Sequence, residues 1–134
     1  MPLNVVTQLM FEGQAEEAMT LYISLFGGSV TSIAKYGPGE HGKEGTIKRA
    51  EFTIGEHKLA CIDSSIKHGF TFTPSISLFV DCRDEAELDK AFAVLSEGGA
   101  VLMPPGNYGF SSKFGWCNDR FGVSWQLNFN DGIS

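Results

Sequence analysis

The chain has 134 residues, of which 43% are hydrophobic, and its formal net charge is −6 at pH 7. This length and composition are typical of a single globular domain, residues 1–134, and they exclude an intrinsically disordered chain. The acidic balance, without a run of Lys or Arg, argues against nucleic acid or a membrane as the partner. No stretch approaches the ~20 apolar residues of a membrane span, and the first residues lack a signal-peptide pattern, so we expect a cytoplasmic protein.

The first half of the chain predicts a strand, a helix and three more strands. An alternating apolar run covers Leu3–Phe11, and Ala15–Phe26 has apolar residues at helical spacing. Gly27-Gly28 follows this segment and is typical of a helix end. Three further apolar runs predict the remaining strands, at Val30–Tyr36, Ile47–Ile54 and Lys58–Asp63. We take residues 1–63 as the first module.

A connector, residues 64–74, leads to a second module, residues 75–134, with the same order of elements. The predicted helix is Glu85–Leu95, and Pro104–Gly109 is a predicted loop. The predicted strands are Ile76–Val80, Val101–Met103, Lys113–Asn118 and Val123–Phe129. Residues 15–30 also align with residues 86–101 at an offset of 71, with Ala, Glu, Gly, Gly and Val identical in both copies. This repeat predicts an α+β fold of two tandem βαβββ modules, whose sheets form a cup with the helices outside.

Three cysteines, Cys61, Cys82 and Cys117, are widely spaced and odd in number. A disulfide framework or a zinc site requires closer spacing, so we expect buried thiols in a reducing compartment.

Strand alternation predicts which side chains face the cup, because successive residues point to opposite faces of a sheet. If Leu9 and Phe11 pack against the helix, Gln8 and Met10 face the cup. The same argument places Ser77, Phe79 and Gln126 on the cup face. We expect these residues, with Arg49 of a neighbouring strand and with Tyr108 and Trp116 as aromatic walls, to form a ligand-binding surface.

Two carboxylates are candidates for a catalytic base. Glu51 shares a strand face with Arg49, and this pair either orients a ligand, acts in acid–base chemistry, or is an ordinary exposed ion pair. Asp63 is either a buried carboxylate or a turn former at the end of its strand.

Several short motifs together resemble one protein family. They are Leu9-x-Phe11-x-Gly13-x-Ala15-x-Glu17-Ala18, Tyr22 and Phe26-Gly27 in the first module, and Asp81-Cys82, Gly98-Gly99, Tyr108-Gly109 and Asp119-x-Phe121-Gly122-x-x-Trp125 in the second. The chain is similar to the PhnB-like branch of the vicinal oxygen chelate superfamily, which includes glyoxalases, bleomycin-resistance proteins and extradiol dioxygenases. This branch is often labelled by similarity to 3-demethylubiquinone-9 3-methyltransferases, but no nucleotide-type cofactor motif is present here.

The resemblance also implies where a metal would bind. Metal-dependent relatives use four ligands, one from the first and one from the last strand of each module, usually His and Glu. The matching positions here read Val6 or Gln8, Ala60 or Asp63, Ser77, and Gln126. These side chains are poor ligands for a divalent ion, so we expect no metal and no other cofactor.

Three functions remain open. The chain is a metal-free protein that binds a small molecule in the cup, an enzyme of the same superfamily (a lyase, isomerase or dioxygenase) with Glu51 or Asp63 as its base, or a dimeric interaction module without a ligand. The resemblance implies a homodimer, and the many large apolar residues of so short a chain favour one as well.

Overall fold

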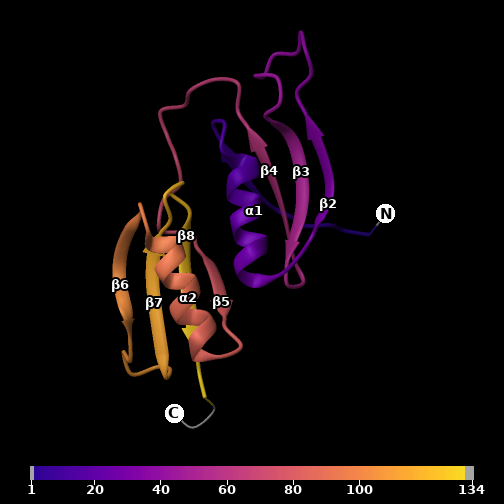
Figure 1. Cartoon of the computed structure of the whole chain (residues 1–134). Coiled ribbons are helices and arrows are strands. Elements are labelled where there is room, and N and C mark those ends of the chain that lie inside the picture. Colours follow the sequence, from indigo (N-terminus) through magenta and orange to yellow (C-terminus); the bar gives the residue numbers. More distant parts are fainter. Residues whose placement is uncertain (1, 132–134) are drawn as a thin grey trace. The chain divides into compact units, whose positions relative to one another are not determined.

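The computed structural model describes residues 2–131, which divide into two compact units on either side of the Gly69–Phe70 bond. The first unit contains β1 (Thr7–Phe11), α1 (Ala15–Phe26), β2 (Val30–Lys35), β3 (Ile47–Ile54) and β4 (His57–Asp63). The second contains β5 (Leu78–Asp81), α2 (Glu85–Ser96), β6 (Ala100–Gly106), β7 (Lys113–Asn118) and β8 (Ser124–Phe129). In Figure 1, each helix lies against the sheet of its own unit.

Both units have the same topology, which confirms the predicted pair of βαβββ modules and the α+β class. The strand order is β1-β4-β3-β2 in the first sheet and β5-β8-β7-β6 in the second. The first strand of each unit pairs parallel with the last, and the other neighbouring strands pair antiparallel. β1 and β5 are therefore edge strands of their sheets.

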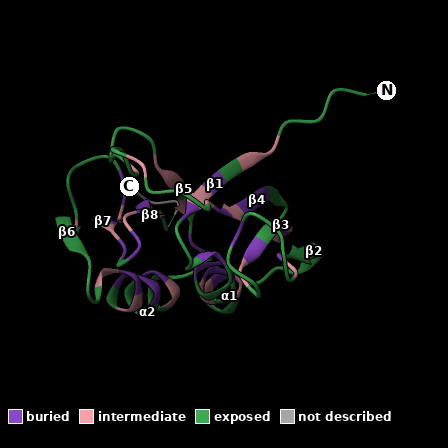
Figure 2. Cartoon of the chain, turned by 90° about the horizontal axis from the view of Figure 1, so that it is seen from above, coloured by how far each residue is buried: buried purple, intermediate pink, exposed green. Residues whose placement is uncertain are grey.

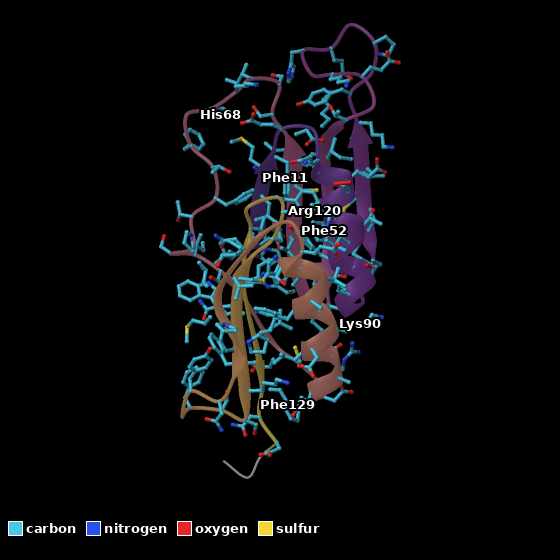
Figure 3. All side chains as sticks on the ribbon, turned by 60° about the vertical axis from the view of Figure 1, so that its left-hand side comes forward. Phe11, Phe52, His68, Lys90, Arg120 and Phe129 are labelled. Carbon is cyan, nitrogen blue, oxygen red and sulfur yellow. The ribbon has the colours of Figure 1, made fainter. Side chains whose placement is uncertain are left out.

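Each helix buries one side against its sheet and leaves the other exposed (Figure 2). In the first unit, Tyr22 of α1 is fully buried, and Phe11 and Phe52 of the sheet belong to the same core (Figure 3). In the second unit, α2 packs against β7 and β8, and Lys90 lies on its exposed side. None of the helices within residues 2–131 is long and apolar enough to cross a membrane.

The two helices correspond at an offset of 70 residues, not 71. At 70, buried Ala18 and Tyr22 match buried Leu88 and Phe92. At 71, every buried residue of α1 falls on an exposed position of the second unit. The second unit has one extra residue, Glu97, between its helix and its glycine pair. Matching the glycines in the sequence therefore shifts the helices out of phase by one residue.

The predicted start of β1 and the predicted end of β6 are corrected. β1 begins at Thr7 instead of Leu3, because residues 2–6 have no partner strand, and Leu3 is 92% exposed. The short strand predicted at Val101–Met103 extends as β6 to Gly106. Two prolines lie inside it, which is possible because β6 is an edge strand and needs no donor on its open side.

One glycine in each unit allows a close approach between backbones. A Cβ atom on Gly28 would lie 1.9 Å from the carbonyl oxygen of Thr53, and one on Gly99 would lie 2.1 Å from that of Asn118. Both glycines lie between the helix and the next strand, where the chain passes the end of β3 or β7. Only a residue without a side chain fits at either position.

Candidate functional site

The open face of the first sheet, opposite α1, carries a small polar group. Arg49 of β3 donates a hydrogen bond to the Oε1 atom of Gln8 on β1, and its Nη2 atom lies 3.7 Å from a carboxylate oxygen of Glu51. The hydroxyl of Ser32 on β2 contacts the same carboxylate at 3.4 Å. Gln8, Arg49 and Glu51 thus lie on one face, as alternation predicts. Both ends of the Arg49–Glu51 pair are more than two-fifths exposed, so its stabilising effect is small.

Asp63 lies on the opposite face, under α1. Its Oδ1 atom accepts hydrogen bonds from the backbone N–H groups of Gly13 (2.8 Å) and Ala15 (3.0 Å), and its Oδ2 atom accepts one from Ile47 (2.9 Å). The N-cap residue Gln14 makes no side-chain capping bond, so Asp63 satisfies donors at the start of α1 from a distant strand. Of the two possibilities for Asp63, the buried carboxylate is the correct one, and its contacts are with the backbone. It does not join Glu51 on the open face.

Gly115 shows which residues of β7 point to the open face of the second sheet, opposite α2. A Cβ atom on this residue would point at the ring of Phe92 in α2, at 2.7 Å, so its neighbours Phe114 and Trp116 point to the other side. Three rows of partnered residues cross this open face: Phe79–Gln126–Trp116–Met103, Asp81–Asn128–Phe114–Gly106, and Ser124–Asn118–Ala100. The predicted site residues Phe79, Trp116 and Gln126 are therefore side by side in one row.

A chain of polar contacts links two of these strands to Ser77, which immediately precedes β5. The indole N–H of Trp116 donates to the hydroxyl of Ser124 at 2.8 Å, and this hydroxyl lies 2.6 Å from that of Ser77. The side-chain amide of Gln126 donates to Ser77 at 3.2 Å. Ser77 and Gln126 are partly exposed, whereas Ser124 is 1% exposed.

Aromatic side chains gather around Phe114 at the other end of this face. The ring of Phe114 is 5.0 Å from that of Phe110, 6.2 Å from that of Tyr108 and 6.3 Å from that of Phe79. Phe114 is 4% exposed, while the three surrounding rings are 43–59% exposed. Such an exposed aromatic group is unusual for a surface that contacts only water.

The sequence argument missed two contributors to this face, Phe110 and Phe114. Phe114 was available from the alternation of β7, because it lies two residues before Trp116 and points to the same side of the strand. Phe110 precedes β7 in a segment without regular structure, and no periodic signal assigns it to the face.

Two buried oxygen atoms have no hydrogen-bond partner within residues 2–131, the Oδ1 atoms of Asn118 and Asn128. Both residues are on the open face of the second sheet, and the amide nitrogen of Asn128 donates to Asp81 at 3.0 Å. A buried acceptor without a partner is costly, and both atoms lie below the surface of this face, where another molecule does not reach them directly.

The three cysteines are free and buried. Burial raises the pKa of the Cys61 thiol to about 12, with Asp63 adding to the effect, and burial likewise raises the pKa of Cys117 to about 12. For Cys82, burial raises the pKa to about 11. An activated nucleophile requires a lowered pKa, so the described surroundings of these thiols do not suit covalent catalysis.

The side chains at the positions expected for metal ligands do not fit the metal that this type of fold can hold. Within residues 2–131, no three His, Cys, Asp or Glu side chains are grouped so that they could bind an ion. Gln8, Ser77 and Gln126 offer neutral oxygens and nitrogens, and Asp63 is directed at backbone N–H groups on the helix side. Neutral amides and hydroxyls without a carboxylate or imidazole are weak ligands for a divalent ion.

Comparisons with known proteins agree on the family. The model of the family named 3-demethylubiquinone-9 3-methyltransferase matches residues 3–128. A PhnB protein from Bacillus cereus, which carries the same methyltransferase description, is 52% identical, with a TM-score of 0.91 over 95% of this chain and 99% of that one. The protein PA1353 from Pseudomonas aeruginosa is 31% identical, with a TM-score of 0.78 over 96% and 98% of the two chains. Among curated proteins, none matches.

More distant structures share the fold. The fosfomycin resistance protein FosX from Listeria monocytogenes is 8% identical, with a TM-score of 0.62 over 98% of this chain and 96% of that one. The chain therefore belongs to the 3-demethylubiquinone-9 3-methyltransferase-like (PhnB) family and has the fold of the vicinal oxygen chelate superfamily.

The methyltransferase name of the family does not fit the site described here. Methyl transfer requires a bound methyl donor, and nucleotide-type donors are held by a glycine-rich turn between a strand and a helix. Both glycine pairs of this chain instead follow helices, at the C-terminal ends of α1 and α2.

Proposed function

We propose that this protein binds a small, partly apolar organic molecule without a metal and sequesters it instead of transforming it. The observation that carries the proposal is the open face of the second sheet. There, exposed aromatic rings lie beside neutral polar groups that are already oriented by hydrogen bonds to one another. Small-molecule sites commonly combine apolar walls with a few fixed polar groups in this way.

The candidate ligand-binding residues fall into two groups of different character. Gln8, Met10 and Arg49 belong to the first sheet, where the polar group includes a charged pair. The second sheet contributes neutral and aromatic residues, namely Ser77, Phe79, Tyr108, Trp116 and Gln126. A ligand with an apolar body and neutral polar groups suits the second set, while Arg49 suits a hydrogen-bonding or anionic group.

A second candidate function is catalysis with Glu51 as the base. The carboxylate of Glu51 is exposed on the open face beside Arg49, so a substrate could reach it. Asp63 is the weaker candidate for this role, because its two oxygens already accept three backbone hydrogen bonds. Loss of turnover in Glu51→Gln, with ligand affinity unchanged, would favour the enzyme over the binding protein.

We further propose a cytoplasmic homodimer. Three buried free thiols suit a reducing compartment. Large apolar residues are also exposed on the isolated chain, including Leu3 (92%) and Val5 (79%), and a twofold interface would bury such residues. Sedimentation equilibrium at micromolar concentration tests the dimer, since a mass of 14.6 kDa would mean a monomer.

A fragment screen on the purified protein tests ligand binding. The set contains neutral aromatic, anionic aromatic and aliphatic compounds, each measured by ligand-observed NMR with and without EDTA. Trp116 provides a second signal, because Trp125 is fully buried and a bound ring should change the fluorescence of Trp116 alone.

We expect neutral aromatic fragments to bind equally well in EDTA, and Phe79→Ala to weaken them several-fold through loss of ring contacts. The matched control is Ile33→Ala, which removes an exposed apolar side chain from the helix-side face of the first sheet. Absence of any binding fragment, binding that requires an added divalent ion, or equal effects of the two variants would contradict the proposal.

A further inference from the structure

The polar chain on the second sheet determines the direction of its own hydrogen bonds. An indole N–H can only donate, so the hydroxyl oxygen of Ser124 accepts from Trp116. One hydrogen lies between the hydroxyls of Ser124 and Ser77, which are 2.6 Å apart. If Ser77 supplied it, the hydroxyl hydrogen of Ser124 would need another acceptor. Ser124 is 1% exposed, and its hydroxyl has no further partner among residues 2–131. Ser124 therefore donates to Ser77.

This direction leaves Ser77 with a free donor. Its oxygen accepts from Ser124 and from the side-chain amide of Gln126, which occupies both lone pairs. The hydroxyl hydrogen of Ser77 remains, and Ser77 is partly exposed, so that hydrogen is available to a ligand. Next to it, the Oε1 atom of Gln126 is an acceptor without a hydrogen bond among the described residues. The face thus presents one O–H donor and one carbonyl acceptor side by side.

The residues beside the Ser77 donor and the Gln126 acceptor indicate the shape of a ligand that would bind to both. Gln126 lies between Phe79 and Trp116 in one row across the sheet. Phe79 is 55% exposed, so its ring is available to another ring. Planar aromatic molecules gain from such contacts beyond the area that they bury. An anion is disfavoured, because Oε1 of Gln126 would face a second acceptor and Asp81 lies in the neighbouring row.

We propose that this face selects a planar aromatic molecule with a neutral C=O and N–H group in the cis arrangement, as in an aromatic lactam. The Ser77 hydroxyl donates to the ligand carbonyl, and the ligand N–H donates to Oε1 of Gln126. This inference rests on the proposed function, and it names the ligand class at the same site.

The test uses two probes that differ by one donor, isoquinolin-1-one and its N-methyl derivative. Both are planar and neutral, but only the first has an N–H. We expect the lactam to bind the wild-type protein about tenfold more tightly, the value of one well-placed hydrogen bond. Gln126→Leu should remove this preference, and Ser77→Ala should weaken both probes because both have the carbonyl. The matched control is Ser75→Ala, because the hydroxyl of Ser75 contacts only Thr73 among the described residues.

The outcomes separate the inference from the proposed function. Equal affinity of the two probes for the wild-type protein overturns the inference without any variant having to fold. A preference for the lactam that persists in Gln126→Leu also overturns it. If neither probe binds while other neutral fragments do, the inference fails and the proposed function stands. If no fragment of any class binds, both fail.

Discussion

The substitution Asp63→Asn gives the sharpest test of how the first unit is held together. The side chain is 2% exposed, and its two oxygens accept three backbone N–H groups, from Gly13, Ala15 and Ile47. Asparagine has the same shape but carries only one acceptor oxygen. Whichever way its amide is oriented, an NH₂ group then faces at least one backbone N–H that had an acceptor.

The expected loss of stability follows from these contacts. One buried donor without a partner costs about 1–3 kcal/mol, and loss of the charge weakens the remaining bonds by about 1 kcal/mol each. The sum is about 3–5 kcal/mol, a large part of the ~5–15 kcal/mol that stabilises an ordinary domain. Urea unfolding followed by circular dichroism should show a lower midpoint with an unchanged m-value.

Hydrogen exchange adds a local readout, because the amides of Gly13, Ala15 and Ile47 should exchange faster in the variant than in the wild-type protein. Glu56→Gln is the control, since Glu56 is exposed in the turn between β3 and β4 and should change stability by less than about 0.5 kcal/mol. If Asp63→Asn were as stable as this control, the structural role of Asp63 would be refuted, and Asp63 would again be a candidate for the catalytic base.

Two further predictions concern the close backbone contact and the thiols. Gly99→Ala should destabilise the protein by several kcal/mol, because the new Cβ atom would overlap the Asn118 carbonyl. Gly69→Ala is the control: its Cβ atom would meet nothing within 4 Å, so the change should be neutral or slightly stabilising. Thermal melts of the two variants check this, and equal melting temperatures would contradict the close contact at Gly99. The pKa values of the buried thiols Cys61 and Cys117 are raised to about 12, above the unfolded value near 9, so their contribution to stability is complete below pH 9 and is lost as the pH rises toward 12. Labelling with a thiol reagent at pH 8 should therefore be slow in the native protein and fast in urea, and fast native labelling would contradict it.

Much of the fold could be predicted because its signals are local. The bounds of α1, β3 and β7 agree with the prediction, since apolar spacing and flanking glycines mark both ends of these elements. The start of β1 could not be predicted in this way. Residues such as Leu3 and Val5 have strand-like composition, but a strand requires a partner, and the pairing of β1 with β4 begins only at Thr7. Composition is a property of the segment itself, whereas strand pairing depends on the position of the neighbouring strand.

The candidate site was predictable to the extent that it depends on alternation. The alternation of side chains along each strand is enough to predict which face of the sheet carries Gln8, Phe79 and Gln126, and the strand register agrees. Hydrogen-bond partners cannot be read from parity, because they depend on which strands are neighbours and on their register. The contact of Ser77 with Ser124 joins residues 47 positions apart, and it exists only because β5 pairs with β8.

The two modules share one topology and each has a buried aspartate that serves the fold, but their open faces differ in charge. Asp63 accepts three hydrogen bonds in the first unit, and Asp119 accepts three in the second, from the backbone of Phe121 and Val123 and from the indole of Trp125. Both aspartates are buried and serve the fold, so neither is available to a ligand. On the open face of the first sheet, the polar group carries the charges of Arg49 and Glu51. On the open face of the second sheet, the hydrogen-bonded side chains from Trp116 to Gln126 are all neutral. We therefore expect recognition of a neutral molecule to depend on the second sheet, and any acid–base chemistry to depend on Glu51 of the first.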